Sequence, residues 1–287
     1  MSVTAALYVV ATPIGNLEDI SARALQVLSQ VDLIAAEDTR HSAKLLHHYG
    51  ITTAVMSVHD HNERAQVPRL IEALRTGKSI ALISDAGTPL LSDPGFHLVR
   101  AARAAGVRVV PIPGACAATA ALSAAGLPTD RFVFEGFPPA RASARRAAFE
   151  ATRSETRTLV YYESSHRILE SLADMVSVFG ADRSAAIARE LTKKFETVMD
   201  GSLGELQARV TQEANEQLGE FVVLIHGAPA LADAPLSAET ERVLRTLLES
   251  LSLKEAVTLA ARLTGVHKNA LYERALVLKR EPPAGGE

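Results

Sequence analysis

The chain of 287 residues lacks several features that would assign it quickly to a class. It has one cysteine, Cys116, which excludes an internal disulfide framework and fits a reducing cytosol best. No residues have the spacing of a zinc site, and we expect no metal. No apolar run approaches the roughly 20 residues that a membrane helix needs. No basic segment precedes the apolar residues at the start, so we expect neither a signal peptide nor a membrane partner.

The chain also lacks an excess of basic residues and the common nucleotide-binding motifs. Its net charge is -3, which argues weakly against a non-specific nucleic-acid binder. Two segments are nevertheless basic, residues 141–157 and 252–280. Each could be a solvated helix face or a contact for nucleic acid. Neither G-x-G-x-x-G nor the P-loop pattern occurs, so the dinucleotide and NTP interpretations lose their main support.

Short apolar runs alternate with helical patterns along most of the chain. The runs "LYVVAT", "DLIAAED", "SIALIS" and "VRVVPIPG" are continuous, as in strands that are buried on both faces. Strands that alternate with helices predict parallel sheets covered by helices. We therefore expect an α/β fold: two successive α/β/α domains with mainly parallel sheets, at residues 1–125 and 126–228.

A Pro/Ala-rich stretch then leads to a helical segment, residues 236–287. Ser252 and Glu255 match a capping box that starts the middle helix, and Gly265 ends it. Short helices joined by a glycine turn resemble a helix-turn-helix. A small helical cap remains the alternative.

Three loops rich in glycine and proline follow predicted strands. We name them the first loop (residues 11–16, "ATPIGN"), the second loop (84–95, "SDAGTPLLSDPG") and the third loop (111–119, "PIPGACAAT"). Ligands of open α/β sheets bind outside the carboxyl ends of the strands. One such loop alone would be an ordinary turn. Three on one predicted edge favour a ligand site.

Taken in order, the motifs resemble those of the tetrapyrrole-methylase superfamily, and within it the small-subunit rRNA (cytidine-2′-O)-methyltransferases. The resemblance runs in order from about residue 7 to 227. The helical tail that follows also resembles that branch. The resemblance rests on the segments "LYVVATPIGNLEDIS", "AAEDTRHS", "SVHDHNE", "SDAGTPLLSDPG", "PIPGACAATAAL", "FEGFPP", "YYESSHRI" and "ARELTKKFE".

The resemblance implies a cleft between the two α/β domains, in which S-adenosylmethionine binds and is held largely by backbone groups. We place Asp85 nearest its ribose or amino group, although a capping role is the alternative. Cys116 would be a small packing residue and not a nucleophile, because no histidine base is near it in sequence. The residues implied to contact the cofactor are Pro13, Ile14, Gly15, Asp85, Gly87, Thr88, Gly114, Ala115, Cys116, Ala117, Tyr162 and Leu191.

Methylation of a ribose hydroxyl calls for a general base, which contributes about 10²–10⁴ in rate. We favour Glu163 and His166, which follow a predicted strand at the cleft. Asp38 is a further candidate, as are Glu37 and His59. The alternative for Glu163 is an ion pair with Arg167 at i,i+4 spacing. Expected substrate contacts are Arg40 and Arg167, as phosphate holders, together with His59, Asn62, Arg141 and Arg145.

The expected partner is small-subunit ribosomal RNA, within the small ribosomal subunit, in the cytoplasm. The resemblance also implies a homodimer, and C₂ pairing is the commonest symmetry of soluble oligomers. Two other functions stay open. One is methylation of a tetrapyrrole precursor ring, and the other is a non-enzymatic nucleotide-binding regulator on the same fold.

Overall fold

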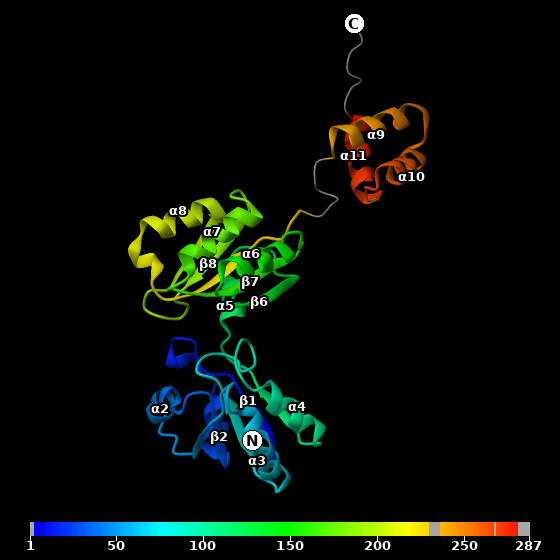
Figure 1. The fold of residues 1–287 in the computed structure, drawn as a ribbon. Coiled ribbons are helices and arrows are strands. Elements are labelled where there is room, and N and C mark those ends of the chain that lie inside the picture. Colours follow the sequence, from blue (N-terminus) through cyan, green and yellow to red (C-terminus); the bar gives the residue numbers. More distant parts are fainter. Residues whose placement is uncertain (1–2, 230–235, 267, 281–287) are drawn as a thin grey trace. The chain divides into compact units, whose positions relative to one another are not determined.

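The computed structural model describes residues 3–229, 236–266 and 268–280 (Figure 1). The chain divides into two compact units. The larger one ends at His226 and omits Ser154–Thr156, and the smaller one joins Ser154–Thr156 to the chain from Gly227 onward. None of the helices in the described ranges has both the length and the apolar character needed to cross a bilayer.

The first sheet of the larger unit has five parallel strands in the order β3-β2-β4-β1-β5. Its central strands are buried on both faces, which explains their continuous apolar sequences. Because all five strands run the same way, their carboxyl ends share one edge. The strands are β1 (Leu7–Val10), β2 (Leu33–Ala36), β3 (Val55–Ser57), β4 (Ile80–Ile83) and β5 (Val109–Ile112).

Two pairs of helices cover this sheet. Helices α1 and α2 bury Val27, Leu28 and Leu45 against one face. Helices α3 and α4 bury Leu70 and Leu98 against the other. Their bounds are α1 (Ala22–Gln30), α2 (Thr39–His48), α3 (Glu63–Arg75) and α4 (Phe96–Ala104), and a 3₁₀ turn, η1 (Leu17–Asp19), precedes α1.

The second sheet has the order β6-β7-β10-β8-β9 and is mixed. Only β6 and β7 pair in parallel, and the other three pairings are antiparallel. The α/β fold with two sheets is confirmed, but this sheet is not mainly parallel. Its strands are β6 (Phe132–Gly136), β7 (Thr158–Ser164), β8 (Ser184–Arg189), β9 (Thr197–Ser202) and β10 (Glu220–Ile225).

Helices also cover both faces of the second sheet. On one face lie α6 (Ala142–Ala151), α7 (Ile168–Phe179) and α8 (Leu203–Gln212), which is followed by the 3₁₀ turn η2 (Ala214–Gln217). On the other face, α5 (Ala117–Ala124) packs Ala121 and Leu122 against Val160 and Leu224. Helix α5 follows β5 of the first sheet yet packs on the second. A division after residue 125 would therefore separate this helix from the sheet that it covers.

In the part of the smaller unit that the structure describes, three helices share a core of their own: α9 (Ala238–Ser250), α10 (Leu253–Thr264) and α11 (Lys268–Arg280). Leu244, Val257 and Leu271 lie at the centre of this core. The predicted capping box of Ser252 and Glu255 is present, and Gly265 ends α10 with a left-handed φ of 72°. These local signals determined the helix bounds correctly.

A buried ion pair joins α6 to α7. The Nε of Arg145 donates to Oδ2 of Asp174 at 2.7 Å, and its Nη1 donates to the Ala140 carbonyl at 3.2 Å. Only 2% of the Arg145 side chain is exposed, so its guanidinium is unavailable to an RNA phosphate. The expectation that Arg145 contacts substrate is therefore wrong, because the sequence shows a basic segment without showing which arginine faces inward.

We expect Arg145→Ala to lower the free energy of unfolding by about 3 kcal/mol, because the buried Asp174 carboxylate loses one of its two cationic partners. Arg146 pairs with the same carboxylate at 3.1 Å, but half of its side chain is exposed. Arg146→Ala should cost about 1 kcal/mol or less. Denaturant titrations of the two variants measure the difference. Equal losses would contradict the structural role of Arg145.

Candidate active site

Hydrogen bonds join the three loops at the carboxyl edge of the first sheet. Thr12 and Gly87 exchange two backbone hydrogen bonds, of 2.8 and 3.0 Å, which connect the first loop to the second. The Thr88 hydroxyl donates to the Ala115 carbonyl at 3.0 Å, which connects the second loop to the third. The three loops therefore form one continuous wall.

Glycine is required where these loops touch. Gly87 has a φ of +80°, and a Cβ there would lie 3.3 Å from Cγ2 of Ile14. A Cβ at Gly114 would lie 3.0 Å from the Cβ of Ala11. Larger side chains at either position would force the loops apart.

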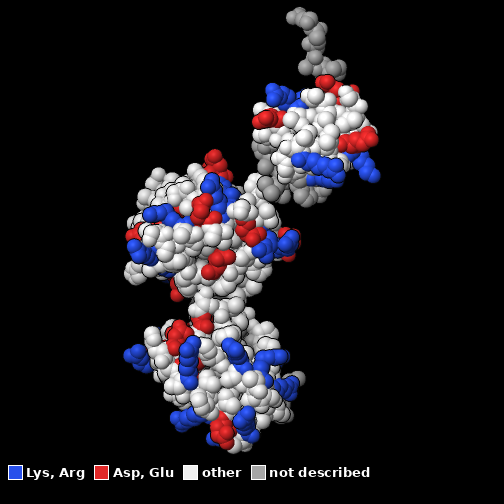
Figure 2. All heavy atoms as spheres, turned by 45° about the vertical axis from the view of Figure 1, so that its right-hand side comes forward, with Lys and Arg blue, Asp and Glu red and all other residues white. Residues whose placement is uncertain are grey.

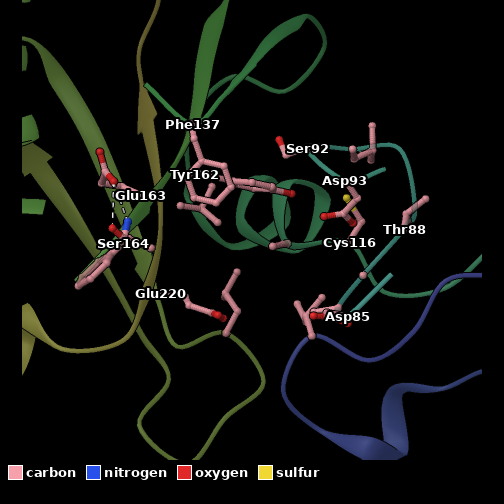
Figure 3. Close-up of a pocket in the computed structure, with 18 of the residues that line it drawn as sticks. Asp85, Thr88, Ser92, Asp93, Cys116, Phe137, Tyr162, Glu163, Ser164 and Glu220 are labelled. Carbon is pink, nitrogen blue, oxygen red and sulfur yellow. Dashed lines mark hydrogen bonds between the residues drawn. The ribbon is translucent and has the colours of Figure 1, made fainter. Parts of the chain in front are cut away.

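The wall borders a cavity of about 320 Å³, within the range of about 300–1,000 Å³ that is typical of small-molecule sites (Figure 3). Eight of the twelve residues expected to contact cofactor line it: Ile14, Asp85, Gly87, Thr88, Cys116, Ala117, Tyr162 and Leu191. The other four lie beside them in the loops and do not line the cavity: Pro13, Gly15, Gly114 and Ala115.

Strands and loops of the second sheet supply the opposite wall. The Tyr162 hydroxyl accepts a hydrogen bond from the Ala118 amide at 3.1 Å. Its ring packs edge-on against Phe134 and Phe137, with centroids 4.9 and 5.5 Å away. Burial raises the pKa of Tyr162 above its usual range, so the phenol stays neutral. This side of the cavity is therefore uncharged and aromatic.

Carboxylates gather where the second loop meets the end of β2. Asp85 Oδ1 accepts from the Asp38 amide at 3.1 Å, and Glu37 Oε2 accepts from the Asp85 amide at 3.3 Å. Burial raises the pKa of Glu37, and it raises the pKa of Asp93 to about 6. One part of the cavity is therefore acidic. Within the described residues, however, no three His, Cys, Asp or Glu side chains are grouped to hold a metal.

Two of the proposed general bases, Glu37 and Glu163, line the cavity. Glu163 is buried at the end of β7. Its carboxylate pairs with Arg167 at 2.9 Å and accepts the Ser171 hydroxyl at 2.5 Å. The ion pair that the i,i+4 spacing offered as the alternative is therefore present. His166 is exposed and does not line the cavity.

Asp38 is the N-cap of α2 and accepts from the Arg40 amide at 2.8 Å. This hydrogen bond is the main cause of a lowered pKa, which makes Asp38 a weak base. It too lies outside the cavity lining. In the structure, Asp38 therefore serves as a helix cap.

The residues expected to contact substrate differ in exposure and in their local partners. Arg40 has 91% of its side chain exposed, and Arg141 is exposed at the start of α6. Arg167 is held by Glu163 and by the Pro138 carbonyl at 3.0 Å.

His59 and Asn62 mainly shape their own turn. The Asn62 side chain accepts from the His59 amide at 2.9 Å and donates to the Ser57 carbonyl at 3.1 Å. Because Arg145 is buried, the six residues do not all share one surface.

Sequence reasoning missed several residues of the cavity lining. Ser92 and Asp93 lie in the second loop, and Phe137 lies in "FEGFPP", so these motifs marked the regions without singling out the residues. Strand β10 carried no signal except its apolar character. The lining residues that were not selected are Ala86, Leu91, Ser92, Asp93, Phe137, Ser164, Ala188, Glu220, Phe221 and Val222.

Comparison with known proteins decides the family. Residues 6–207 match the family model "Tetrapyrrole (Corrin/Porphyrin) Methylases". The chain belongs to this family. Residues 234–279 match the model "RsmI C-terminal HTH domain".

Curated relatives match nearly the whole chain. The protein named Ribosomal RNA small subunit methyltransferase I from Pseudomonas aeruginosa is 58% identical over 94% of this chain and 96% of its own. The protein of the same name from Escherichia coli O157:H7 is 54% identical over 94% of each chain.

Solved structures share the fold of the larger unit. A uroporphyrin-III-C-methyltransferase from Thermus thermophilus superposes with a TM-score of 0.51 at 22% identity, covering 77% of this chain and 93% of its own. A diphthine synthase gives 0.56 at 17% identity, covering 77% and 89%. At these identities the likeness concerns the fold alone.

The methyl donor is S-adenosylmethionine, and the cavity suits it. Gly87 and Gly114 have no side chain at positions where a Cβ would be crowded, so the loop backbone there stays uncovered. Ile14, Leu191 and the Tyr162 ring offer apolar surface, and Asp85 offers an acceptor. This combination fits a ligand that has a methionine chain with a sulfonium, a ribose and a charged amino group.

We expect Gly87→Val to weaken cofactor binding at least tenfold, about 1.4 kcal/mol, because its side chain would crowd Ile14 and the cavity. Gly106→Val is the matched control. Gly106 has a similar φ of +72°, but nothing lies within 4 Å of an added Cβ. Both variants share backbone strain of about 1–2 kcal/mol. Calorimetric titration should find the loss only in Gly87→Val, and an unchanged affinity there would contradict the placement.

Proposed function

We propose that the protein methylates the 2′-hydroxyl of a cytidine in the decoding region of small-subunit ribosomal RNA. The observation that supports this most strongly is the 58% identity, over 94% of the chain, with a protein named Ribosomal RNA small subunit methyltransferase I. The choice of a decoding-region cytidine and of its 2′ oxygen rests on the narrower motif resemblance. We also propose that it acts as a homodimer, in the cytoplasm, on the small ribosomal subunit.

The reaction needs positioning more than new charge stabilisation. When bound, S-adenosylmethionine supplies a methyl group on a positively charged sulfur, which becomes neutral as the methyl leaves. The joined loops fix the backbone that would hold it, and well-oriented reactants lower a barrier by roughly 7–11 kcal/mol. Leu191, Tyr162 and Phe137 line the cavity with apolar surface.

The RNA backbone requires cations outside the cavity. Arg40 and Arg141 are exposed and suit phosphate contacts. Arg167 lies against Glu163 and would present only part of its guanidinium. Figure 2 shows acidic and basic side chains interspersed on the face that it draws, so individual arginines are better candidates than one broad basic field.

A labelled-donor assay tests the function. Purified protein is incubated with methyl-labelled S-adenosylmethionine and small ribosomal subunits, with free rRNA and a porphyrinogen as parallel substrates. We expect label in the subunit rRNA, recovered after nuclease digestion as 2′-O-methylcytidine. Label in porphyrinogen would favour the tetrapyrrole alternative, and cofactor binding without transfer would favour the regulator. Label on a base or another nucleoside would refute the position.

The helical unit is proposed to help seat the RNA. Lys254, Arg262, Lys268 and Lys279 are exposed on its surface. Arg274 instead donates to Glu241, at 2.6 Å for the closer contact. The other member of the expected basic set is Arg280, whose side chain lies outside the description. Four exposed cations therefore carry the proposal.

We expect truncation after residue 230 to weaken binding to the small subunit while leaving cofactor affinity near wild type. Each lost phosphate contact should reduce the salt slope of binding by about 0.7–0.9. A full-length variant with Lys254→Gln and Arg262→Gln should reproduce part of this change while keeping the helical core. Binding is measured at several salt concentrations, and light scattering checks the oligomeric state. An unchanged slope with a monomeric truncation would mean that the unit braces a dimer.

A further inference from the structure

Among the described residues, five carboxylates line the cavity. Two of them accept hydrogen bonds that hold the loop wall together. Glu37 accepts the Asp85 amide, and Asp85 accepts the Asp38 amide. These bonds connect the end of β2 to the second loop. Protonation of either acceptor would weaken the wall that positions the ligands.

Two more carboxylates are committed to cations. Glu163 pairs with Arg167 and accepts hydrogen bonds from Ser164 and Ser171. Glu220 pairs with Lys193 at 2.9 Å. Both carboxylates therefore already have a cationic partner at 2.9 Å.

Asp93 is the remaining carboxylate, and its backbone is tightly constrained. Leu90 and Ser92 both have positive φ, 74° and 68°, which is uncommon for residues other than glycine. Pro94 follows and restricts Asp93 to extended conformations. This constrained loop holds Asp93 beside Cys116 in the cavity, with Tyr162 opposite (Figure 3).

The surroundings of Asp93 oppose its ionisation without preventing it. Burial is the main cause that raises its pKa to about 6, and the negative charges of Glu37, Asp85 and Asp60 act in the same direction. A hydrogen bond from the Ser84 hydroxyl acts against them. The neighbouring Tyr162 is neutral. A general base works best when its pKa lies near the working pH, because it is then largely ionised and still basic enough to accept a proton.

We propose that Asp93 is the general base that takes the proton from the substrate hydroxyl. This inference rests on the proposed function. As the hydroxyl oxygen bonds to the methyl carbon, the bond from that carbon to sulfur breaks, and its electron pair remains on sulfur. The hydroxyl proton passes to an Asp93 carboxylate oxygen and then to water. No other reactant is needed.

The decisive variant is Asp93→Asn, which keeps the size of the side chain and removes its basicity. Single-turnover methylation of small subunits should slow about 10²–10⁴-fold. Cofactor affinity by calorimetry and subunit affinity by filter binding should stay within about twofold of wild type. Asp182→Asn, an exposed aspartate that does not line the cavity, is the matched control and should retain the wild-type rate.

Glu37→Gln distinguishes Asp93 from its acidic neighbour. Glutamine keeps an oxygen that can accept the Asp85 amide, so the rate should fall less than tenfold. A large loss in Glu37→Gln combined with a normal rate in Asp93→Asn would overturn the assignment. If the wild type forms no 2′-O-methyl nucleoside, the proposed function itself fails, and the two failures are thus distinguishable.

The pH dependence gives two further readouts. The wild-type rate should fall as pH drops through about 6, because Asp93 becomes protonated, and Asp93→Asn should lack this acidic limb. Because the pKa of Asp93 is raised in the fold, the folded state favours the protonated carboxyl. The contribution of this protonated carboxyl to stability is therefore present at pH 4 and is lost as pH rises through 6. Cofactor-free Asp93→Asn should therefore melt at the wild-type temperature or above it at pH 8. A lower melting temperature with a parallel loss of cofactor affinity would indicate a structural role.

Discussion

The pair of backbone hydrogen bonds between Thr12 and Gly87 holds the site together. It joins the ends of two neighbouring strands, β1 and β4, and the Thr88 hydroxyl extends the connection to the third loop. Backbone groups used in this way cannot be replaced by a side chain, and glycine is the residue that allows the close approach. The positions of Asp85 and Asp93 depend on this arrangement, because both lie on the loop that Gly87 anchors.

The sequence predicted the loops because their signals are local. Glycine and proline restrict or free the backbone at their own positions, and strand ends were evident from apolar runs. The capping box at Ser252 and the turn at Gly265 were predictable for the same reason. The order of strands in a parallel sheet then places the loops at one edge, which the α/β alternation already implied.

The roles of individual charged residues could not be predicted, because burial and pairing are tertiary properties. Arg145 and Arg146 are adjacent in sequence, yet one lies inside the fold and the other at the surface. Glu163 lies in the cavity, where a base would be needed, but its carboxylate forms an ion pair with Arg167. Asp93 resembled a turn residue until the structure placed it beside other carboxylates in a cavity. The mixed second sheet was also missed, because buried parallel and antiparallel strands have similar apolar sequences.

The order of strands in the first sheet has a consequence for biosynthesis. Strand β1 is synthesised well before its partners β4 and β5, where Leu7 pairs with Ile80 and Val109. Ribosomes add about 5–20 residues per second. The first strand must therefore wait on the order of several seconds for its neighbours, with its apolar side chains unpaired in the meantime. Exposed apolar surface and unpaired strand edges make an incompletely folded chain prone to aggregate, so β1 is exposed to this hazard until β4 and β5 are made.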